Sequence, residues 1–85
     1  MDKQHDVQQV DFDGSMMILS VDGRVYRLPL AVVSSRLAIA TDAERRVYRI
    51  SPSGYGIHWL VVDEDLSVDG LIKLAEQLDY SLPKN

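Results

Sequence analysis

The first third of the chain contains two Asp-Gly pairs, each flanked by apolar residues. They stand at positions 13–14 and 22–23. Because Asp-Gly favours the two-residue turns that match the twist of neighbouring strands, this pattern predicts three antiparallel strands near residues 7–12, 15–21 and 24–28.

The turns also predict which residues face one another. If the second Asp-Gly pair forms the two central turn residues, Leu19 lies opposite Tyr26 and Met17 lies opposite Leu28. The same rule at the first pair places Val10 opposite Met17. These residues share one face of the predicted sheet, which we expect to be the core face.

Helical patterns follow these strands. Pro29 cannot donate a backbone hydrogen bond to a sheet, so we expect the third strand to end there and one short helix to run over 30–37. Thr41 and Glu44 have the spacing of a capping box, which predicts a second, very short helix.

The second half of the chain predicts a further hairpin and a longer helix. A turn at residues 51–54 connects β-forming segments at 47–50 and 55–60. Ser67 has the position of a helix cap, and the helix after it carries one apolar stripe, formed by Val68, Leu71, Ile72, Ala75 and Leu78.

These elements predict an α+β domain. We expect one small antiparallel sheet of about five short strands, packed against the C-terminal helix and the short central helices. Residues 7–78 form this single domain, and residues 1–6 and 79–85 are expected to be tails.

Composition and charge narrow the classes of function. The 85 residues have a net charge of −4 and include no cysteine, which excludes thiolate chemistry and favours the cytoplasm. No apolar run approaches the ~20 residues needed to span a bilayer, and the polar N-terminus does not resemble an export signal. We therefore expect neither a membrane-spanning segment nor export.

All six arginines lie within residues 22–50. The acidic total argues against a dedicated nucleic-acid binder, because clustered Lys and Arg supply most of the affinity for phosphates. The arginine block nevertheless keeps a nucleic-acid-binding regulator open as the alternative function.

His58 and the consecutive acids Asp63, Glu64 and Asp65 are residue types found in metal and acid–base sites. We expect His58 on a strand and the acids in a solvated loop, so their spacing does not support one site. A metal-dependent hydrolase is therefore a weaker hypothesis than the nucleic-acid-binding regulator. We predict no enzyme activity, no metal and no cofactor.

Two segments near the C-terminal half resemble a small bacterial family known only as domain of unknown function 2442. They are the run Tyr55-Gly56-Ile57-His58-Trp59 and the run from Asp63 to Leu71. Further similarity upstream runs from the second Asp-Gly turn through Leu28-Pro29-Leu30 to Glu44-Arg45-Arg46, so the resemblance covers residues 7 to 74. Leu60 departs from the family, in which Pro usually follows the Trp.

The resemblance implies a small mixed α and β domain. It also implies an antitoxin-like role, since some members are encoded beside a small basic protein in what looks like a toxin and antitoxin pair. The leading interpretation is therefore a non-catalytic protein-binding module for a small basic, toxin-like partner, and a homodimer also stays open.

Six residues are candidates for contact with such a partner. The acidic loop would meet the basic partner, and the single Trp either packs in the core or anchors an interface. Arg45, Arg46 and Arg49 form either a solvated helix face or a basic patch for nucleic acid or an acidic partner. The candidates are Trp59, Asp63, Glu64, Asp65, Arg45 and Arg46.

Overall fold

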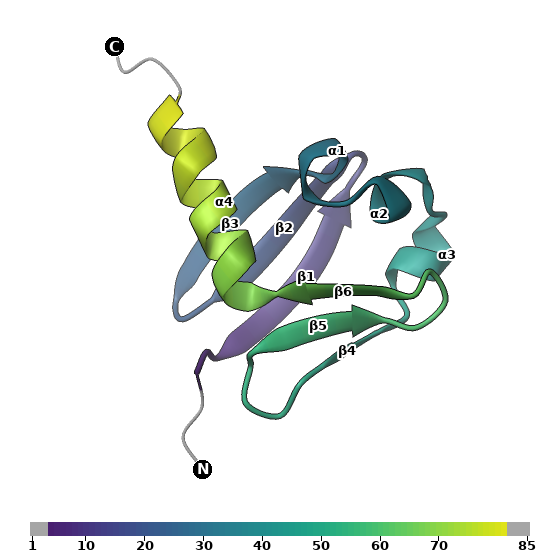
Figure 1. Ribbon diagram of the computed structural model, residues 1–85, viewed down its shortest axis with the longest axis horizontal. Coiled ribbons are helices and arrows are strands. Elements are labelled where there is room, and N and C mark those ends of the chain that lie inside the picture. The colour runs from purple at the N-terminus through teal and green to yellow at the C-terminus, as the bar shows by residue number, and fades with distance from the viewer. Residues whose placement is uncertain (1–3, 82–85) are drawn as a thin grey trace.

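Two antiparallel sheets and four helices make up the part of the chain that the computed structural model describes, residues 4–81, of which 79–81 are described by their backbone alone. The first sheet has the order β1 (Val7–Asp13), β2 (Met16–Val21), β3 (Arg24–Pro29). The second has the order β4 (Tyr48–Ile50), β5 (Gly56–Trp59), β6 (Glu64–Ser67). The helices are α1 (Leu30–Val33), α2 (Ser35–Ile39), α3 (Asp42–Arg45) and α4 (Val68–Ser81), and α4 directly follows β6 (Figure 1).

The α+β class is confirmed, but the single sheet of about five strands is wrong. The additional strand is β6, which covers residues that the sequence assigns to an acidic loop. Its backbone pairs with β5, placing Leu66 opposite Ile57 and Asp65 opposite His58. Acidic residues are poor strand formers by themselves, so tertiary pairing overrides the local preference here.

The two Asp-Gly turns have different geometries. Asp22 and Gly23 both have positive φ, and the predicted pairs of Leu19 with Tyr26 and Met17 with Leu28 are confirmed. In the first turn only Gly14 has positive φ, Asp13 stays in the strand, and Val10 pairs with Leu19 instead of Met17. Because the register differs by two residues, the same side chains still face the core.

The helix predicted over residues 30–37 is divided at Ser34. Pro29 is the last residue of β3 and precedes α1, while Ser34 has extended backbone angles and separates α1 from α2. The Ser34 hydroxyl accepts a hydrogen bond from the backbone N–H of Leu37, so it caps α2. A residue that favours caps over helix interiors therefore interrupts an otherwise helical apolar spacing.

The predicted capping box, the second hairpin and the cap at Ser67 are confirmed. Thr41 and Glu44 form the capping box of α3, and β4 pairs with β5 as the second hairpin. The backbone N–H of Gly70 donates to the Ser67 hydroxyl at 2.8 Å, as expected for a cap at the start of α4.

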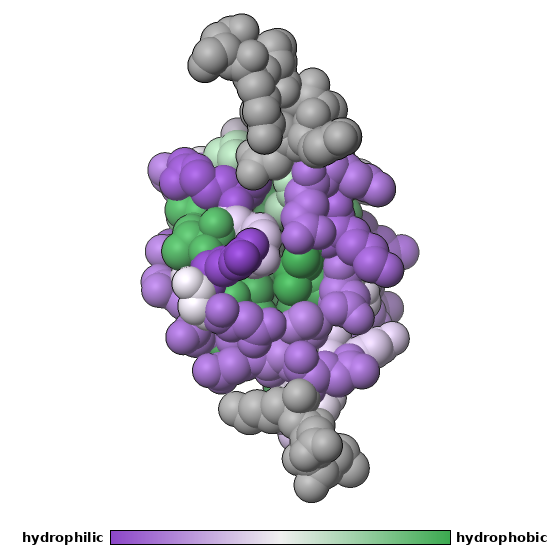
Figure 2. Space-filling model, turned by 90° about the vertical axis from the view of Figure 1, so that its left-hand side faces the viewer, coloured by the Kyte–Doolittle hydropathy of each residue, from purple (hydrophilic) through white to green (hydrophobic). Residues whose placement is uncertain are grey.

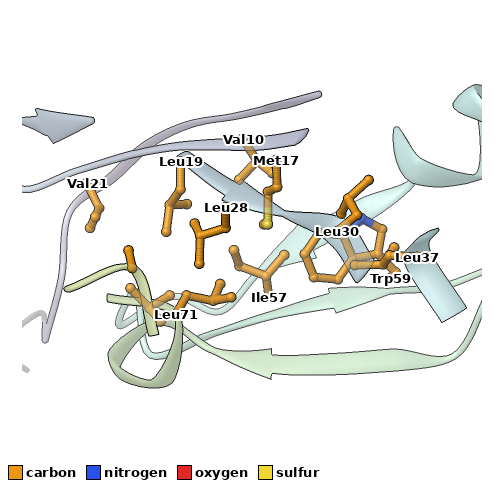
Figure 3. Packing of buried hydrophobic residues seen from close by; sticks show 12 residues of the cluster. Val10, Met17, Leu19, Val21, Leu28, Leu30, Leu37, Ile57, Trp59 and Leu71 are labelled. Atoms are coloured by element: carbon orange, nitrogen blue, oxygen red, sulfur yellow. The ribbon is translucent and has the colours of Figure 1, made fainter. Parts of the chain in front are cut away.

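The core lies between the β1–β3 sheet on one side and the second sheet with α4 on the other. Figure 3 shows Met17, Leu19 and Leu28 pointing toward Ile57 and Leu71 from the opposite layer. The predicted stripe of α4 belongs to this core, because Val68, Leu71 and Ala75 are buried and Ile72 packs against the cluster. Among the described residues, no helix has the length and apolar composition needed to cross a membrane.

Seen from the side, hydrophobic groups reach the surface near the middle of the molecule, and hydrophilic residues surround them (Figure 2). The core residues themselves are at most 7% exposed, so the apolar groups at the surface are mainly other, partly exposed side chains.

Both predicted tails contain ordered elements. The backbone N–H groups of Gln4 and His5 donate to the carbonyl oxygen of Ser53 at 2.8 and 3.3 Å, so this end is attached to the domain. At the other end α4 continues to Ser81, three residues beyond the predicted boundary. The rest of the two tails lies outside the described residues.

Replacing Leu71 with Ala should lower the free energy of unfolding by about 2 to 5 kcal/mol, because the side chain is 3% exposed and fills the centre of the core. Denaturant unfolding measures this loss. The matched control is Ile39→Ala, at a position that is 87% exposed, which should change stability by less than about 0.5 kcal/mol. Equal effects of the two changes would show that α4 is peripheral.

Candidate functional site

Trp59 belongs to the core. Its side chain has 0% exposure, and its indole Nε1–H donates to the carbonyl oxygen of Arg45 at 2.9 Å. Its ring centroid lies 6.0 Å from that of Tyr48. A side chain without exposed surface cannot touch a partner, so the structure excludes Trp59 as a direct contact residue in this conformation.

Arg45 is also a structural residue. It is 8% exposed, and its guanidinium donates to the carbonyl oxygens of Leu37, Gly14 and Ala38 at 2.9, 2.9 and 3.0 Å. The prediction of a solvated or partner-facing side chain is wrong for Arg45, because these buried carbonyls need hydrogen-bond donors and the guanidinium supplies them.

The arginine block is divided in space. Arg27 lies on β3 and Arg36 on α2, where its guanidinium donates to the carbonyl oxygen of Asp63 at 2.6 Å. Arg46 stays exposed, with a guanidinium nitrogen 4.0 Å from a carboxylate oxygen of Asp11. Residues that are close in the sequence therefore contribute to different parts of the surface.

The three acids also separate, because neighbouring residues on a strand point to opposite faces. Glu64 is half-buried, and its carboxylate accepts hydrogen bonds from the Ser34 hydroxyl at 2.5 Å and the Asp65 backbone N–H at 3.1 Å. Asp63 and Asp65 remain exposed. The expectation of a solvated acidic loop is therefore wrong for Glu64, which connects β6 to the junction of α1 and α2.

This separation also disperses the suspected metal ligands. Asp65 and His58 share the outer face of the second sheet, while Glu64 pairs with Trp59 and points the other way. Within the described part of the chain, no three His, Asp or Glu side chains lie close enough together to hold a metal ion.

The solvent face of the second sheet carries a row of three polar side chains. The strand pairing places Arg49 opposite His58 and His58 opposite Asp65. His58 Nδ1 lies 2.7 Å from a carboxylate oxygen of Asp65, which accepts the hydrogen bond from the ring. The row therefore crosses the sheet from a guanidinium to a hydrogen-bonded carboxylate.

A hollow of about 580 Å³ adjoins this row. Its apolar lining includes Pro52 and Tyr55, and its polar border includes the three side chains of the row. The volume falls within the range of about 300 to 1,000 Å³ that is typical of ligand pockets. This hollow and the row, which we call the outer-face site, form the candidate functional site.

The sequence suggested Arg49 only as part of a basic patch with Arg45 and Arg46, and His58 only as a metal or acid–base residue, while Tyr55 was not predicted as a contact residue. One signal for the first two was available, since the turn at residues 51–54 predicts the hairpin that places Arg49 opposite His58. The position of Asp65 depends on β6, for which the sequence offers no local signal.

His5 links distant parts of the chain, although it was expected in a tail. Its Nδ1 lies 2.7 Å from a carboxylate oxygen of Asp22, and its Nε2 lies 2.6 Å from one of Asp69. Both nitrogens can donate at once only when the imidazole is protonated. The ring thereby connects the β2–β3 turn to the start of α4.

These contacts change the pKa values of the partners. The hydrogen bonds to Asp22 and then Asp69 raise the pKa of His5 above its ordinary value of 6.5, against the opposing effect of burial. A hydrogen bond from the backbone N–H of Asp6, and then the contact with His5, lower the pKa of the Asp22 carboxyl below 3.8.

Comparisons with known proteins identify a family and a fold. The family model described as "Protein of unknown function (DUF2442)" matches residues 7–77. A crystal structure of a protein of unknown function from Rhodospirillum rubrum ATCC 11170 is similar with a TM-score of 0.65 and 24% identity, over 84% of this chain and 88% of that one. Its similarity supports the fold alone. No curated protein matches the chain.

Glu64→Gln should destabilise the protein by about 1 kcal/mol, because an amide NH₂ replaces one of the two carboxylate oxygens that now accept hydrogen bonds. Asp63→Asn is the matched control and should change stability by less than about 0.5 kcal/mol, since its side chain is exposed. Denaturant unfolding of both variants measures the difference. Equal losses would contradict a structural role that is specific to Glu64.

His5→Gln should lower the stability of the fold by an amount that depends on pH. Because the pKa of His5 is raised in the folded state, its contribution is complete below pH 6.5 and is lost as the pH rises through the folded-state pKa. The lowered pKa of Asp22 makes the contribution fade again as the pH falls below 3.8 toward the folded-state value. Thermal unfolding midpoints of the wild type should exceed those of His5→Gln most at pH 5 to 6 and converge in alkaline buffer.

The matched control for this measurement is His58→Gln, which changes the other histidine. A His5→Gln difference that stays constant over the whole pH range would contradict the charged bridge.

Proposed function

We propose that this chain, which belongs to the DUF2442 family of proteins of unknown function, is a non-catalytic protein-binding domain that meets its partner with the outer-face site. The observation that carries the proposal is the hollow of about 580 Å³ on the solvent face of the second sheet. One-sided antiparallel sheets usually present a polar face to water, so an apolar hollow on that face favours a binding role.

Exposed apolar side chains extend this surface. Tyr55 borders the hollow and is 55% exposed. Leu60 donates a backbone hydrogen bond to Val47, which places these two residues side by side, and their exposures are 45% and 43%. Aromatic and aliphatic side chains of this kind form the centres of protein interfaces.

Two exposed acidic side chains suggest the charge of the partner. Asp63 and Asp65 are exposed on and beside β6, and the chain has a net charge of −4. Complementary charges speed association, so a small basic protein fits these two exposed carboxylates and the acidic chain as a whole. An antitoxin-like role toward such a protein, which the family resemblance implies, is the form of the proposal that we carry forward.

A binding role is also supported by the arrangement of the titratable groups. Arg49, His58 and Asp65 form a row across three strands, with Asp65 hydrogen-bonded to the imidazole. A hydrolase would instead need its nucleophile, base and electrophilic groups to converge on one reacting atom. Nucleic-acid binding has less support, because the arginines are spread over several elements.

The proposal predicts that changes on the outer face will abolish capture of a partner. Tagged wild type should retain a specific small protein from a lysate of the source organism, and Tyr55→Ala combined with Leu60→Ser should lose it. Both residues are exposed, so the thermal midpoint should change little. The control is Val25→Ser, which changes a residue that is 65% exposed on the other sheet.

Mass spectrometry of the retained material measures the outcome. Capture that is equal for all three proteins would overturn the proposal. Retention of nucleic acid, with a steep loss at higher salt, would instead favour the nucleic-acid-binding regulator.

A further inference from the structure

Arg49 is the charged group of the outer-face site that lacks a partner. Its side chain is exposed at the border of the hollow, and its guanidinium makes no hydrogen bond or ion pair with the residues that the structure describes. A guanidinium has five N–H donors in a planar fork that matches a carboxylate. Arg49 is therefore prepared to bind an anion from outside the chain.

The carboxylate at the other end of the row already has a hydrogen-bond partner. Asp65 accepts the hydrogen bond from His58 at 2.7 Å. Asp65 lies on β6 and Arg49 on β4, with β5 between them, so about 10 Å of sheet separates the two strands. The Asp65 carboxylate consequently leaves the guanidinium of Arg49 free for a ligand.

The apolar lining of the hollow indicates that the ligand also carries an apolar group. Pro52 and Tyr55 offer apolar surface next to the guanidinium, and Tyr55 is 55% exposed. An inorganic anion would use the guanidinium but leave this surface uncovered. An aromatic or aliphatic group that carries its own carboxylate would use both.

We propose that the hollow binds a segment of the protein partner in which a carboxylate adjoins an apolar or aromatic side chain, with the carboxylate on Arg49 and the apolar group against Tyr55 and Pro52. This inference rests on the proposed function, because it takes the partner to be a protein. It extends that proposal by stating the chemistry of the partner segment that enters the hollow. The basic surface of the same partner would face Asp63 and Asp65.

Three small probes test the chemistry of the site in the full chain. N-acetylphenylalanine carries both an aromatic group and a carboxylate, N-acetylphenylalaninamide lacks the charge, and N-acetylglycine lacks the aromatic group. Two-dimensional NMR titration should show shifts for the amides of residues 49–58 and 65–67 with N-acetylphenylalanine, with a dissociation constant in the millimolar range. The other two probes should bind about tenfold more weakly or not at all.

Arg49→Gln should weaken binding of N-acetylphenylalanine about tenfold, because it removes the charge and most donors of the fork. Arg24→Gln is the matched control, since Arg24 lies on the other sheet, and it should bind as the wild type does. Equal binding of the acid and its amide, or an Arg49→Gln variant that binds as well as the wild type, would overturn the inference. Inorganic phosphate that competes as well as N-acetylphenylalanine would also overturn it.

The capture experiment with Arg49→Gln then distinguishes this inference from the proposed function. Loss of the captured protein supports the assignment of the site to a partner segment. Unchanged capture by Arg49→Gln, together with its loss in the Tyr55→Ala and Leu60→Ser double variant, would overturn the carboxylate assignment while the proposed function stands.

Discussion

The buried guanidinium of Arg45 is the interaction on which the arrangement of this domain depends. It donates to carbonyl oxygens of Gly14, Leu37 and Ala38, and so joins the β1–β2 turn to the end of α2. The carbonyl oxygen of the same residue accepts the indole N–H of Trp59. Loss of this side chain would remove three hydrogen bonds at once, two of them to partly buried carbonyl oxygens, those of Gly14 and Ala38. One residue thus attaches the second sheet to the first.

The outer-face site follows from that attachment. Since Trp59 is fixed in the core, the alternation of β5 turns Ile57 inward and His58 outward. The pairing with β4 and β6 then places Arg49 and Asp65 beside His58. The chemistry of the solvent face is therefore a consequence of the packing on the opposite face, and a one-residue change of register would exchange the two.

The sequence predicted the features whose signals are local. The Asp22–Gly23 turn, the capping box of Thr41 and the apolar stripe of α4 each depend on residues a few positions apart, and all are confirmed. The strand β6 depends instead on distant contacts, among them its pairing with β5 and the hydrogen bond from the Ser34 hydroxyl to Glu64, which is 30 residues away. Arg45 was misassigned to a partner surface for the same reason, since its burial is set by distant contacts. Of the two alternatives for Trp59, distant contacts select packing in the core.

The turn at residues 51–54, which borders the outer-face site, depends on contacts with the beginning of the described chain. The turn that carries Pro52 is held by the backbone N–H groups of Gln4 and His5, which donate to the carbonyl oxygen of Ser53. Gly54 has a φ of +71°, and a Cβ there would meet the carbonyl oxygen of His5 at 1.9 Å, so only glycine allows this approach. His5 itself is held by carboxylates from the β2–β3 turn and from α4. Residues at the beginning of the chain thus set the position of the turn that borders the candidate site about 50 residues later, which is why local sequence patterns identify the turn but not the hollow beside it.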